Sequence, residues 1–285
     1  MSADVLDLNG PRGSNTCPLG LCDGSGFMVD EATNTASDCR CRASRIARRR
    51  AASLEGRIPK RYRGASFDRP PVLGMPEPVV SSVRSYVRNL GARIDEGRGM
   101  WLVGDVGTGK TTLAMIVSGA ALEAGYTVAI YSLPRLLNLI RDEVGTENSL
   151  LDLLDRLSAV DLLHIDDLGA QHTTPWRLEQ LYSIVDARYQ AGRPIIATTN
   201  LMPEDLAKQM GRQIHTTVTE DDGGQSTERR VVSNDASEVV GQRIVSRLVE
   251  MCGDPLPVFG EDMRRLPYEA APTTSSAGLG SARRV

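Results

Sequence analysis

The segment GDVGTGKTT, at residues 104–112, constrains the fold of this chain more than any other feature. It fits the pattern G-x-x-x-x-G-K-[ST], in which backbone N–H groups of a glycine-rich loop wrap around a chain of phosphates. The pattern requires a strand before the loop and a helix after it. Residues 100–103 (MWLV) suit a buried strand, and residues 111–125 suit a helix that ends at a glycine. The sequence therefore predicts a nucleotide-binding P-loop rather than a chance Gly-rich turn.

Individual residues of this loop are expected to bind different parts of a nucleotide. Lys110 can reach the β- and γ-phosphates, which makes it a candidate catalytic residue, and the Thr111 hydroxyl can ligate Mg²⁺. The predicted nucleotide contacts in the loop are Gly104, Asp105, Val106, Gly107, Thr108, Gly109, Lys110, Thr111 and Thr112.

Strand and helix patterns alternate after the loop. Apolar runs at 126–132, 160–165 and 194–200 suit buried strands, and amphipathic runs between them suit helices. Pro134 and Pro175 fit the first turns of two of these helices. Alternation of this kind around a P-loop predicts an α/β fold with a doubly wound parallel sheet, in which the ligand lies at the carboxyl ends of the strands.

Two acids follow the strand at 160–165. Carboxylates at the end of an apolar strand are costly unless a cation or water lies nearby. We expect Asp166 to hold Mg²⁺ together with Thr111, and Asp167 to polarise the attacking water. Many ATPases of this type carry Glu at the second position, and Asp is one methylene shorter. We therefore expect hydrolysis that is slow or that needs a partner to set the water geometry.

Asn200 and Arg247 are further candidate catalytic residues. Asn200 ends a strand, where an amide beside the γ-phosphate can orient water; an asparagine that merely ends a strand is the alternative. Arg243 and Arg247 lie four apart on one face of a helix expected at 241–253. An arginine presented across a subunit boundary can neutralise charge on a neighbour's ATP. Two ordinary surface arginines are the alternative.

Four cysteines within 25 residues suggest a metal site near the start of the chain. Cys17 and Cys22 form C-x4-C, and Cys39 and Cys41 form C-x-C. Four thiolates can bind zinc tetrahedrally, and a segment this small would draw its folding energy from the metal. Reduced free thiols are the alternative. Cys252 lies apart and is expected to be a packing residue, as is His164 within its strand.

The net charge of −3 hides a strong asymmetry. Residues 40–64 carry ten Lys or Arg and one acid, a net charge of +9, so the rest of the chain carries −12. Such segregation indicates a basic patch for nucleic acid or for an acidic partner, and a solvated basic helix is the alternative.

No run approaches the length of a membrane span, and the N-terminus lacks the pattern of a signal peptide. We therefore expect a cytoplasmic protein without disulfides and without a membrane partner. The expected organisation is a Cys-rich, basic module at 1–64, a Pro-rich linker at 65–78, an ATPase domain at 79–268 with a flexible insertion at 216–240, and a disordered tail at 269–285.

The motifs, in this order and at these separations, resemble an AAA+ ATPase. In detail they resemble the bacterial replicative helicase loaders of the DnaC/DnaI type and their relatives, the IstB transposition ATPases. The resemblance runs from about residue 80 to about residue 265. The stretches that carry it are WLVGDVGTGKTTLA, DLLHIDDLG, WRLEQLYSIVDARY, RPIIATTNL and GQRIVSRLVEMC.

The resemblance implies an ATPase that uses ATP and Mg²⁺, self-associates through Arg247 as an arginine finger, and binds single-stranded DNA. It also implies a hexameric replicative DNA helicase as partner, bound by the Cys-rich module, which would hold Zn²⁺. Arg264 falls near the family's terminal nucleotide-facing arginine. Arg135 and Arg141 fall where initiator-class members contact single-stranded DNA. The segment 216–240 departs from the family, which places less chain between Asn200 and Arg247.

The resemblance leaves a second function open, an IstB-like ATPase that assists a transposase in selecting target DNA. The Cys-rich module disfavours it, because IstB-like proteins generally begin close to the ATPase core. A zinc-bearing DNA-binding regulator, with its ATPase as a switch, is a third possibility. A small-metabolite kinase is disfavoured by the tandem Asp, the TTN strand end and the R-x-x-x-R helix.

Overall fold

A computed structural model of the chain describes residues 17, 19–30, 33–42, 46, 58–143, 147–169, 174–221, 224–233 and 235–263. No helix in this described part combines the length and apolarity that a membrane crossing needs. Arg264 and the tail expected at 269–285 lie outside the described residues, as does most of the basic stretch before residue 58.

A five-stranded parallel sheet forms the centre of the molecule, with strand order β4-β5-β6-β3-β9. Its strands are β3 (Met100–Val103), β4 (Val128–Ser132), β5 (Leu162–Leu168), β6 (Ile195–Thr199) and β9 (Leu256–Pro257). The first four confirm the strands expected from the apolar runs. The two-residue β9 was not expected, because so short an element has no periodicity to detect.

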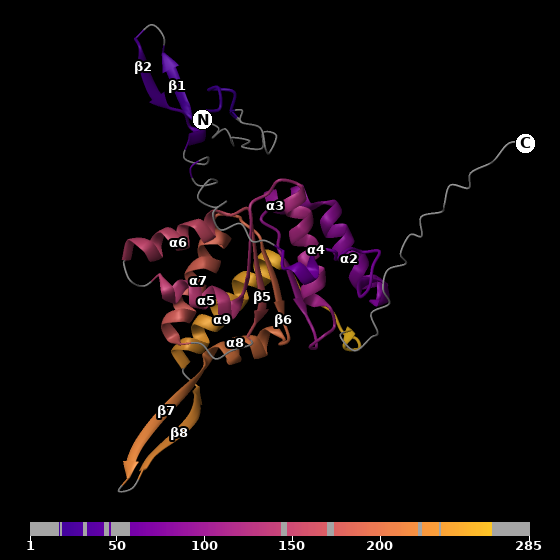
Figure 1. Cartoon of the computed structure of the whole chain (residues 1–285), viewed down its shortest axis with the longest axis vertical. Helices are drawn as coiled ribbons and strands as arrows, with labels where there is room; N and C mark the ends of the chain where they lie inside the picture. Colours follow the sequence, from indigo (N-terminus) through magenta and orange to yellow (C-terminus); the bar gives the residue numbers. More distant parts are fainter. Residues whose placement is uncertain are drawn as a thin grey trace, which may run out of the picture.

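Helices cover both faces of this sheet (Figure 1), which confirms the doubly wound α/β fold. The helices are α2 (Glu77–Arg88), α3 (Leu90–Asp95), α4 (Lys110–Glu123), α5 (Leu133–Asp142), α6 (Glu147–Ala159), α7 (Pro175–Gln190), α8 (Pro203–Gly211) and α9 (Asp235–Cys252). Pro134 and Pro175 lie in the first turns of α5 and α7, as expected from their fixed φ.

Alternating side chains of the strands divide the core into two layers. One layer packs against α5, α7 and α9 and includes Trp101, Ala129, Leu163, Ile165 and Ala197. The other packs against α2 and α4 and includes Leu102, Val128, Leu162 and Ile196. Burial on both faces explains why these strands are continuous apolar runs.

A buried arginine ties α7 to the starts of two strands. Arg188 is fully buried, and its guanidinium donates to the carbonyls of Leu157 at 2.9 Å, Val160 at 2.9 Å and Pro194 at 2.7 Å. These carbonyls belong to the end of α6 and to the turns that lead into β5 and β6. Arg188 therefore stabilises the amino-terminal ends of β5 and β6, at the end of the sheet opposite the P-loop.

Residues 58–75, which we call the strap, precede α2 and contain two short 3-10 turns, Lys60–Tyr62 and Val72–Gly74. We expected a Pro-rich linker at 65–78. The strap instead packs onto the α2/α4 layer, and the remaining residues of the range enter α2. Irregularly spaced apolar residues hold it there: Ile58, Tyr62, Phe67, Val72 and Met75.

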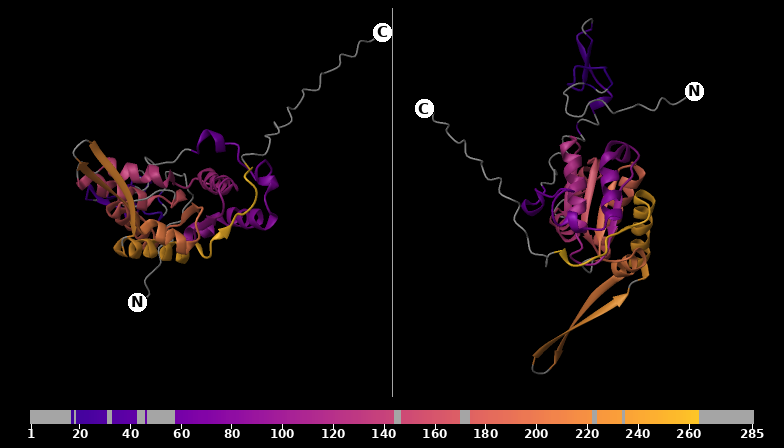
Figure 2. Two further views of the ribbon diagram at one scale, coloured as in Figure 1. Left: turned by 90° about the horizontal axis from the view of Figure 1, so that it is seen from below. Right: turned by 90° about the vertical axis from the view of Figure 1, so that its right-hand side faces the viewer.

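The segment 216–240, expected to be a flexible insertion, contains regular structure. The strands β7 (Arg212–Asp221) and β8 (Gly224–Ser233) pair antiparallel, and α9 begins at Asp235. The hairpin projects from the body of the molecule (Figure 2, right-hand view). Runs of Thr and Val favour strands, and the Asp-Gly pair at 222–223 is a known hairpin signal. The acidic, Gly-rich composition outweighed these signals in the sequence-based prediction.

A small antiparallel hairpin lies near the start of the chain, apart from the parallel sheet (Figure 1). It consists of β1 (Phe27–Asp30) and β2 (Thr35–Asp38), with Phe27 opposite Asp38. Cys17 and Cys22 precede β1, and Cys39 and Cys41 follow β2. The hairpin therefore brings the two cysteine pairs to one end.

Candidate nucleotide-binding site

The P-loop connects β3 to α4, and two of its glycines are required by their surroundings. Gly107 and Gly109 have φ of 85° and 93°, a region that L side chains rarely adopt. A Cβ at Gly107 would overlap the carboxylate of Asp262, and a Cβ at Gly109 would overlap the methyl group of Met75. The loop is therefore enclosed by the strap on one side and by the segment after β9 on the other.

Lys110 opens α4 and folds back over the loop. Its buried Nζ donates to the carbonyl of Gly104 at 2.9 Å and to that of Asp105 at 2.6 Å. The Thr108 hydroxyl also donates to the Asp105 carbonyl, at 2.9 Å. These bonds hold the ammonium group at the loop, where it can meet a polyphosphate.

Thr111 and Asp166 meet as expected from the sequence. The Thr111 hydroxyl donates to Oδ1 of Asp166 at 3.0 Å. A hydroxyl and a carboxylate oxygen at this separation suit a small hard cation such as Mg²⁺, which usually takes one or two protein oxygens beside those of a substrate phosphate. The donor set therefore fits the metal that a bound nucleotide would bring.

Thr198, on β6, is a site residue that the sequence analysis missed. Its hydroxyl donates to Oδ1 of Asp166 at 2.7 Å and accepts the backbone N–H of Asp167 at 2.9 Å. The only sequence signal is its place in the strand end ATTN, two residues before Asn200.

Asp167 lies at an irregularity of the sheet. Its φ is 63°, and the register of β5 against β6 shifts between Ile165 and Leu168. Bulges of this kind re-aim side chains next to functional sites. Here the bulge lets two consecutive acids, Asp166 and Asp167, line the same cavity, although neighbours on a regular strand face opposite ways.

A cavity of about 880 Å³ joins these residues, a volume typical of small-molecule sites. The predicted residues in its wall are Val106, Gly107, Gly109, Lys110, Thr111, Thr112, Asp166, Asp167 and Asn200. Asn200 is exposed at the end of β6. Gly104, Asp105 and Thr108 lie in the loop but are not in the described cavity wall.

The facing wall comes from the strap, which the sequence analysis did not connect with the nucleotide. Its lining residues are Lys60, Arg61, Tyr62, Gly64, Ala65, Arg69, Pro70 and Pro71. Met263, from the segment after β9, lines the cavity as well, and its N–H donates to the Gly107 carbonyl at 3.0 Å.

His164 lies behind Asp166 and is fully buried, as expected of a core residue. Its Nδ1 shares a hydrogen bond of 2.9 Å with the Ser118 hydroxyl on α4. Burial lowers the pKa of His164 to about 4, although the nearby Asp166 acts in the opposite direction. A neutral imidazole therefore lies beside the Asp166 carboxylate at neutral pH.

Arg247 lies on α9 and, among the described residues, is not part of the cavity wall. Its Nε donates to Oδ1 of Asp186 on α7 at 3.1 Å, and its guanidinium carbon lies 4.2 Å from the centroid of the Tyr189 ring. Arg243, one turn earlier, is exposed. Arg247 is thus held near the surface of α7 and α9, with 32% of its side chain exposed.

Arg135 and Arg141, the side chains expected near single-stranded DNA, are both exposed on α5. Arg141 pairs with Asp142 at 3.2 Å. Cys252 lies at the end of α9, where its thiol donates to the Ile195 carbonyl at 3.5 Å and where burial raises its pKa to about 12. This environment agrees with a packing role.

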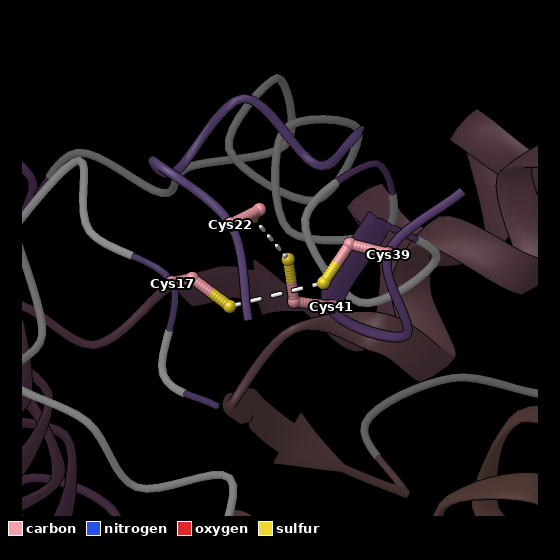
Figure 3. Close-up of side chains that lie close together, drawn as sticks. All are labelled: Cys17, Cys22, Cys39 and Cys41. Carbon is pink, nitrogen blue, oxygen red and sulfur yellow. Dashed lines mark hydrogen bonds between the residues drawn. The ribbon is translucent and has the colours of Figure 1, made fainter. Parts of the chain in front are cut away.

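The four N-terminal cysteines form one cluster (Figure 3). Their sulfur atoms all lie within 4.8 Å of one another, with Cys17 Sγ 3.8 Å from Cys39 Sγ and Cys22 Sγ 3.6 Å from Cys41 Sγ. Sulfur atoms around a tetrahedral zinc, at Zn–S distances of about 2.3 Å, stand about 3.8 Å apart. All four are free thiols, so this donor set fits Zn²⁺.

Comparison with known proteins gives one family. Residues 47–221 match the family described as IstB-like ATP binding protein. The range includes the P-loop, both acids of β5 and the strand end at Asn200.

Individual relatives agree with this family. The chain is 30% identical over 138 residues to the replicative helicase loader DnaC of Escherichia coli (strain K12), covering 47% of this chain and 54% of that protein. It is 27% identical over 198 residues to the phage-like element PBSX protein XkdC of Bacillus subtilis (strain 168), covering 65% and 72%. The chain thus spans about half the length of the DnaC proteins it matches.

Solved structures share the fold. A crystal structure of the DnaC helicase loader aligns with a TM-score of 0.52 at 23% identity, covering 70% of this chain and 99% of that one. A crystal structure of DnaI aligns with a TM-score of 0.51 at 21% identity, covering 75% and 100%.

Proposed function

Because the chain belongs to the family of IstB-like ATP-binding proteins, we propose that it hydrolyses ATP while placing a replicative DNA helicase on single-stranded DNA. The observation that carries the ATPase part is the meeting of Thr111 with Asp166 at 3.0 Å inside a cavity that also holds Lys110 and Asn200. These are the groups that an ATP·Mg²⁺ site needs, and they come from the start of α4, from β5 and from the end of β6.

The roles of the cavity residues follow from their positions. Backbone N–H groups of the P-loop and the Lys110 ammonium would bind the phosphates, and Thr111 with Asp166 would hold Mg²⁺. The metal, when bound, neutralises charge on the phosphate oxygens. Asp167 would accept a hydrogen bond from the attacking water, and the Asn200 amide would orient that water or sense the γ-phosphate.

Hydrolysis would require a second subunit. Arg247 lies outside the cavity of its own chain, and an arginine finger works from a neighbouring subunit. Its bonds to Asp186 and Glu250 keep the guanidinium on the surface formed by α7 and α9. Self-association would bring this surface to the mouth of a neighbour's cavity.

The helicase-loading part rests on the similarity to proteins named as replicative helicase loaders. DnaC of Escherichia coli and DnaI of Bacillus subtilis both match the chain, DnaI with 25% identity over 149 residues. The Cys17–Cys41 module, with zinc bound, would dock on the helicase. Exposed basic side chains such as Arg135 and Arg141 would contact single-stranded DNA. Loading of the helicase on single-stranded DNA would take place in the cytoplasm.

Co-purification with the host's replicative helicase tests this function. The protein, ATP·Mg²⁺ and the helicase are mixed, and the mass of the complex is measured by size-exclusion chromatography with light scattering. We expect a stable complex that requires the cysteine module and loads the helicase on single-stranded DNA. Absence of a complex with wild-type protein would contradict the proposal.

Assistance to a transposase is the second candidate, because the matched family bears the name of IstB. ATP-dependent self-assembly on duplex DNA, without a helicase complex, would favour it. The same chromatography with a duplex in place of the helicase separates the two.

A further inference from the structure

We propose that the strap supplies two cations, Lys60 and Arg69, that bind the phosphates of the nucleotide in cis. The inference rests on the proposed binding of ATP in the cavity and extends the site to the strap, which precedes α2. Lys60 and Arg69 line the same cavity as Lys110, Thr111 and Asp166.

The strap holds a defined position against the core. Tyr62 N–H donates to the Pro59 carbonyl at 2.8 Å, and Val72 N–H donates to the Arg69 carbonyl at 3.0 Å, so both cations lie at tight turns. Ile58 packs near Gly119 of α4, and Met75 contacts Gly109 of the P-loop. The strap is therefore anchored on both sides of its cationic part.

The strap cations differ in what they already bind. Arg61 stacks on the Tyr62 ring, with its guanidinium carbon 4.5 Å from the ring centroid, and it donates to the Tyr62 hydroxyl. Within the described part of the chain, no carboxylate or other acceptor pairs with the Lys60 ammonium or the Arg69 guanidinium. Arg61 is thus engaged, whereas Lys60 and Arg69 are available to a ligand.

The net positive charge of the side chains that line the cavity favours binding of an anion. Four basic side chains line it, Lys60, Arg61, Arg69 and Lys110, against two acids, Asp166 and Asp167. The Mg²⁺ expected beside Asp166 and Asp167 would balance the negative charge of these two acids. Lys110 can neutralise part of the negative charge of a triphosphate. The remaining negative charge of the phosphates can be neutralised by the two strap cations.

Binding of ATP to a double variant tests the inference. In full-length protein, Lys60→Ala with Arg69→Ala should weaken ATP binding about tenfold or more, as expected for loss of charge-assisted hydrogen bonds. Isothermal titration calorimetry measures this. The matched control is Arg88→Ala with Lys208→Ala, which removes two exposed cations that do not line the cavity and should leave affinity unchanged.

The outcomes separate this inference from the proposed function. If wild-type protein fails to bind ATP, the proposed function fails. If wild-type protein binds ATP and the double variant binds it equally well, only the role of Lys60 and Arg69 is overturned.

Hydrogen exchange on wild-type protein covers the case in which the double variant does not fold. ATP should slow amide exchange in the strap around Lys60 and Arg69 as well as in the P-loop. Protection of the P-loop without protection of the strap would overturn the inference.

Discussion

The hydroxyl of Thr198 donates to Oδ1 of Asp166 at 2.7 Å, across two neighbouring strands. The same hydroxyl accepts the N–H of Asp167 at 2.9 Å. One side chain on β6 therefore orients the Asp166 carboxylate and also stabilises the bulge that turns Asp167 into the cavity. Thr198 therefore positions both acids and itself lines the cavity.

Thr198→Val should lower ATP hydrolysis about tenfold, because it removes both bonds but keeps the shape of the side chain. The affinity for ATP, measured by calorimetry, should change little, since the P-loop and Lys110 remain. Ser183→Ala is the control, because that hydroxyl bonds to Glu179 on an exposed turn of α7. Equal hydrolysis by Thr198→Val and wild type would remove Thr198 from the site.

Asp167→Asn should leave ATP binding intact and reduce turnover about a hundredfold, because it removes the carboxylate that polarises water. Asn tolerates the left-handed backbone that Asp167 adopts at φ 63°, so the bulge should survive. Steady-state phosphate release measures turnover. Asp167→Glu, one methylene longer, should alter the rate, and an unchanged rate would contradict the expectation that the short side chain limits hydrolysis.

Two inactive variants should restore activity when mixed. Arg247→Ala keeps an intact cavity but lacks the finger, whereas Lys110→Ala keeps the finger but lacks the phosphate-binding ammonium. Mixed oligomers contain competent cavities that face an intact Arg247, so part of the ATPase activity should return. Arg243→Ala in place of Arg247→Ala is the comparison. If mixing restores nothing while the subunits still associate, Arg247 does not act across the interface.

The cysteine module should contain one zinc ion per chain, measured by elemental analysis of full-length protein. Cys39→Ser should lose the metal, because it removes one of four sulfur ligands. Cys252→Ala should keep it, since Cys252 belongs to the α9 packing. Wild-type protein without zinc, or Cys39→Ser with a full complement, would show that the cluster serves another purpose.

Arg188→Met should lower the free energy of unfolding by about 3 kcal/mol or more, because several buried carbonyls lose their donors. Arg188→Lys should rescue only part of this, since one ammonium cannot reach carbonyls on both β5 and β6 turns. Chemical denaturation measures the change. Arg88→Met, an exposed arginine at the end of α2, is the matched control and should be nearly neutral.

The sequence predicted the sheet wherever a strand is buried on both faces. Residues 100–103 are an uninterrupted apolar run, and residues 160–165 are mostly apolar apart from Asp161 and His164. Burial on both faces favours such runs. The P-loop and the two acids near the end of β5 were recognisable because their chemistry demands fixed residue types at fixed spacing. The Thr111–Asp166 contact followed from their positions at the carboxyl ends of parallel elements.

Other features depend on tertiary contacts that leave little trace in the sequence. The apolar residues of the strap have no regular spacing, and its prolines suggested a linker, so its place in the cavity wall was missed. The role of Thr198 depends on a register shift in β5. Arg188 resembled any basic residue near the end of an amphipathic helix, because most of its carbonyl partners lie about thirty residues earlier, at 157–161, and one lies at Pro194.

The strap also determines where the chain can be divided. A deletion of residues 1–64, intended to remove only the cysteine module, would also remove Lys60 and Tyr62 and so open one wall of the nucleotide cavity. Loss of ATPase activity in such a truncated protein would not report on the cysteines. A cut before Ile58 leaves the strap whole, so the cysteine module and the nucleotide-binding part of the chain can be studied apart.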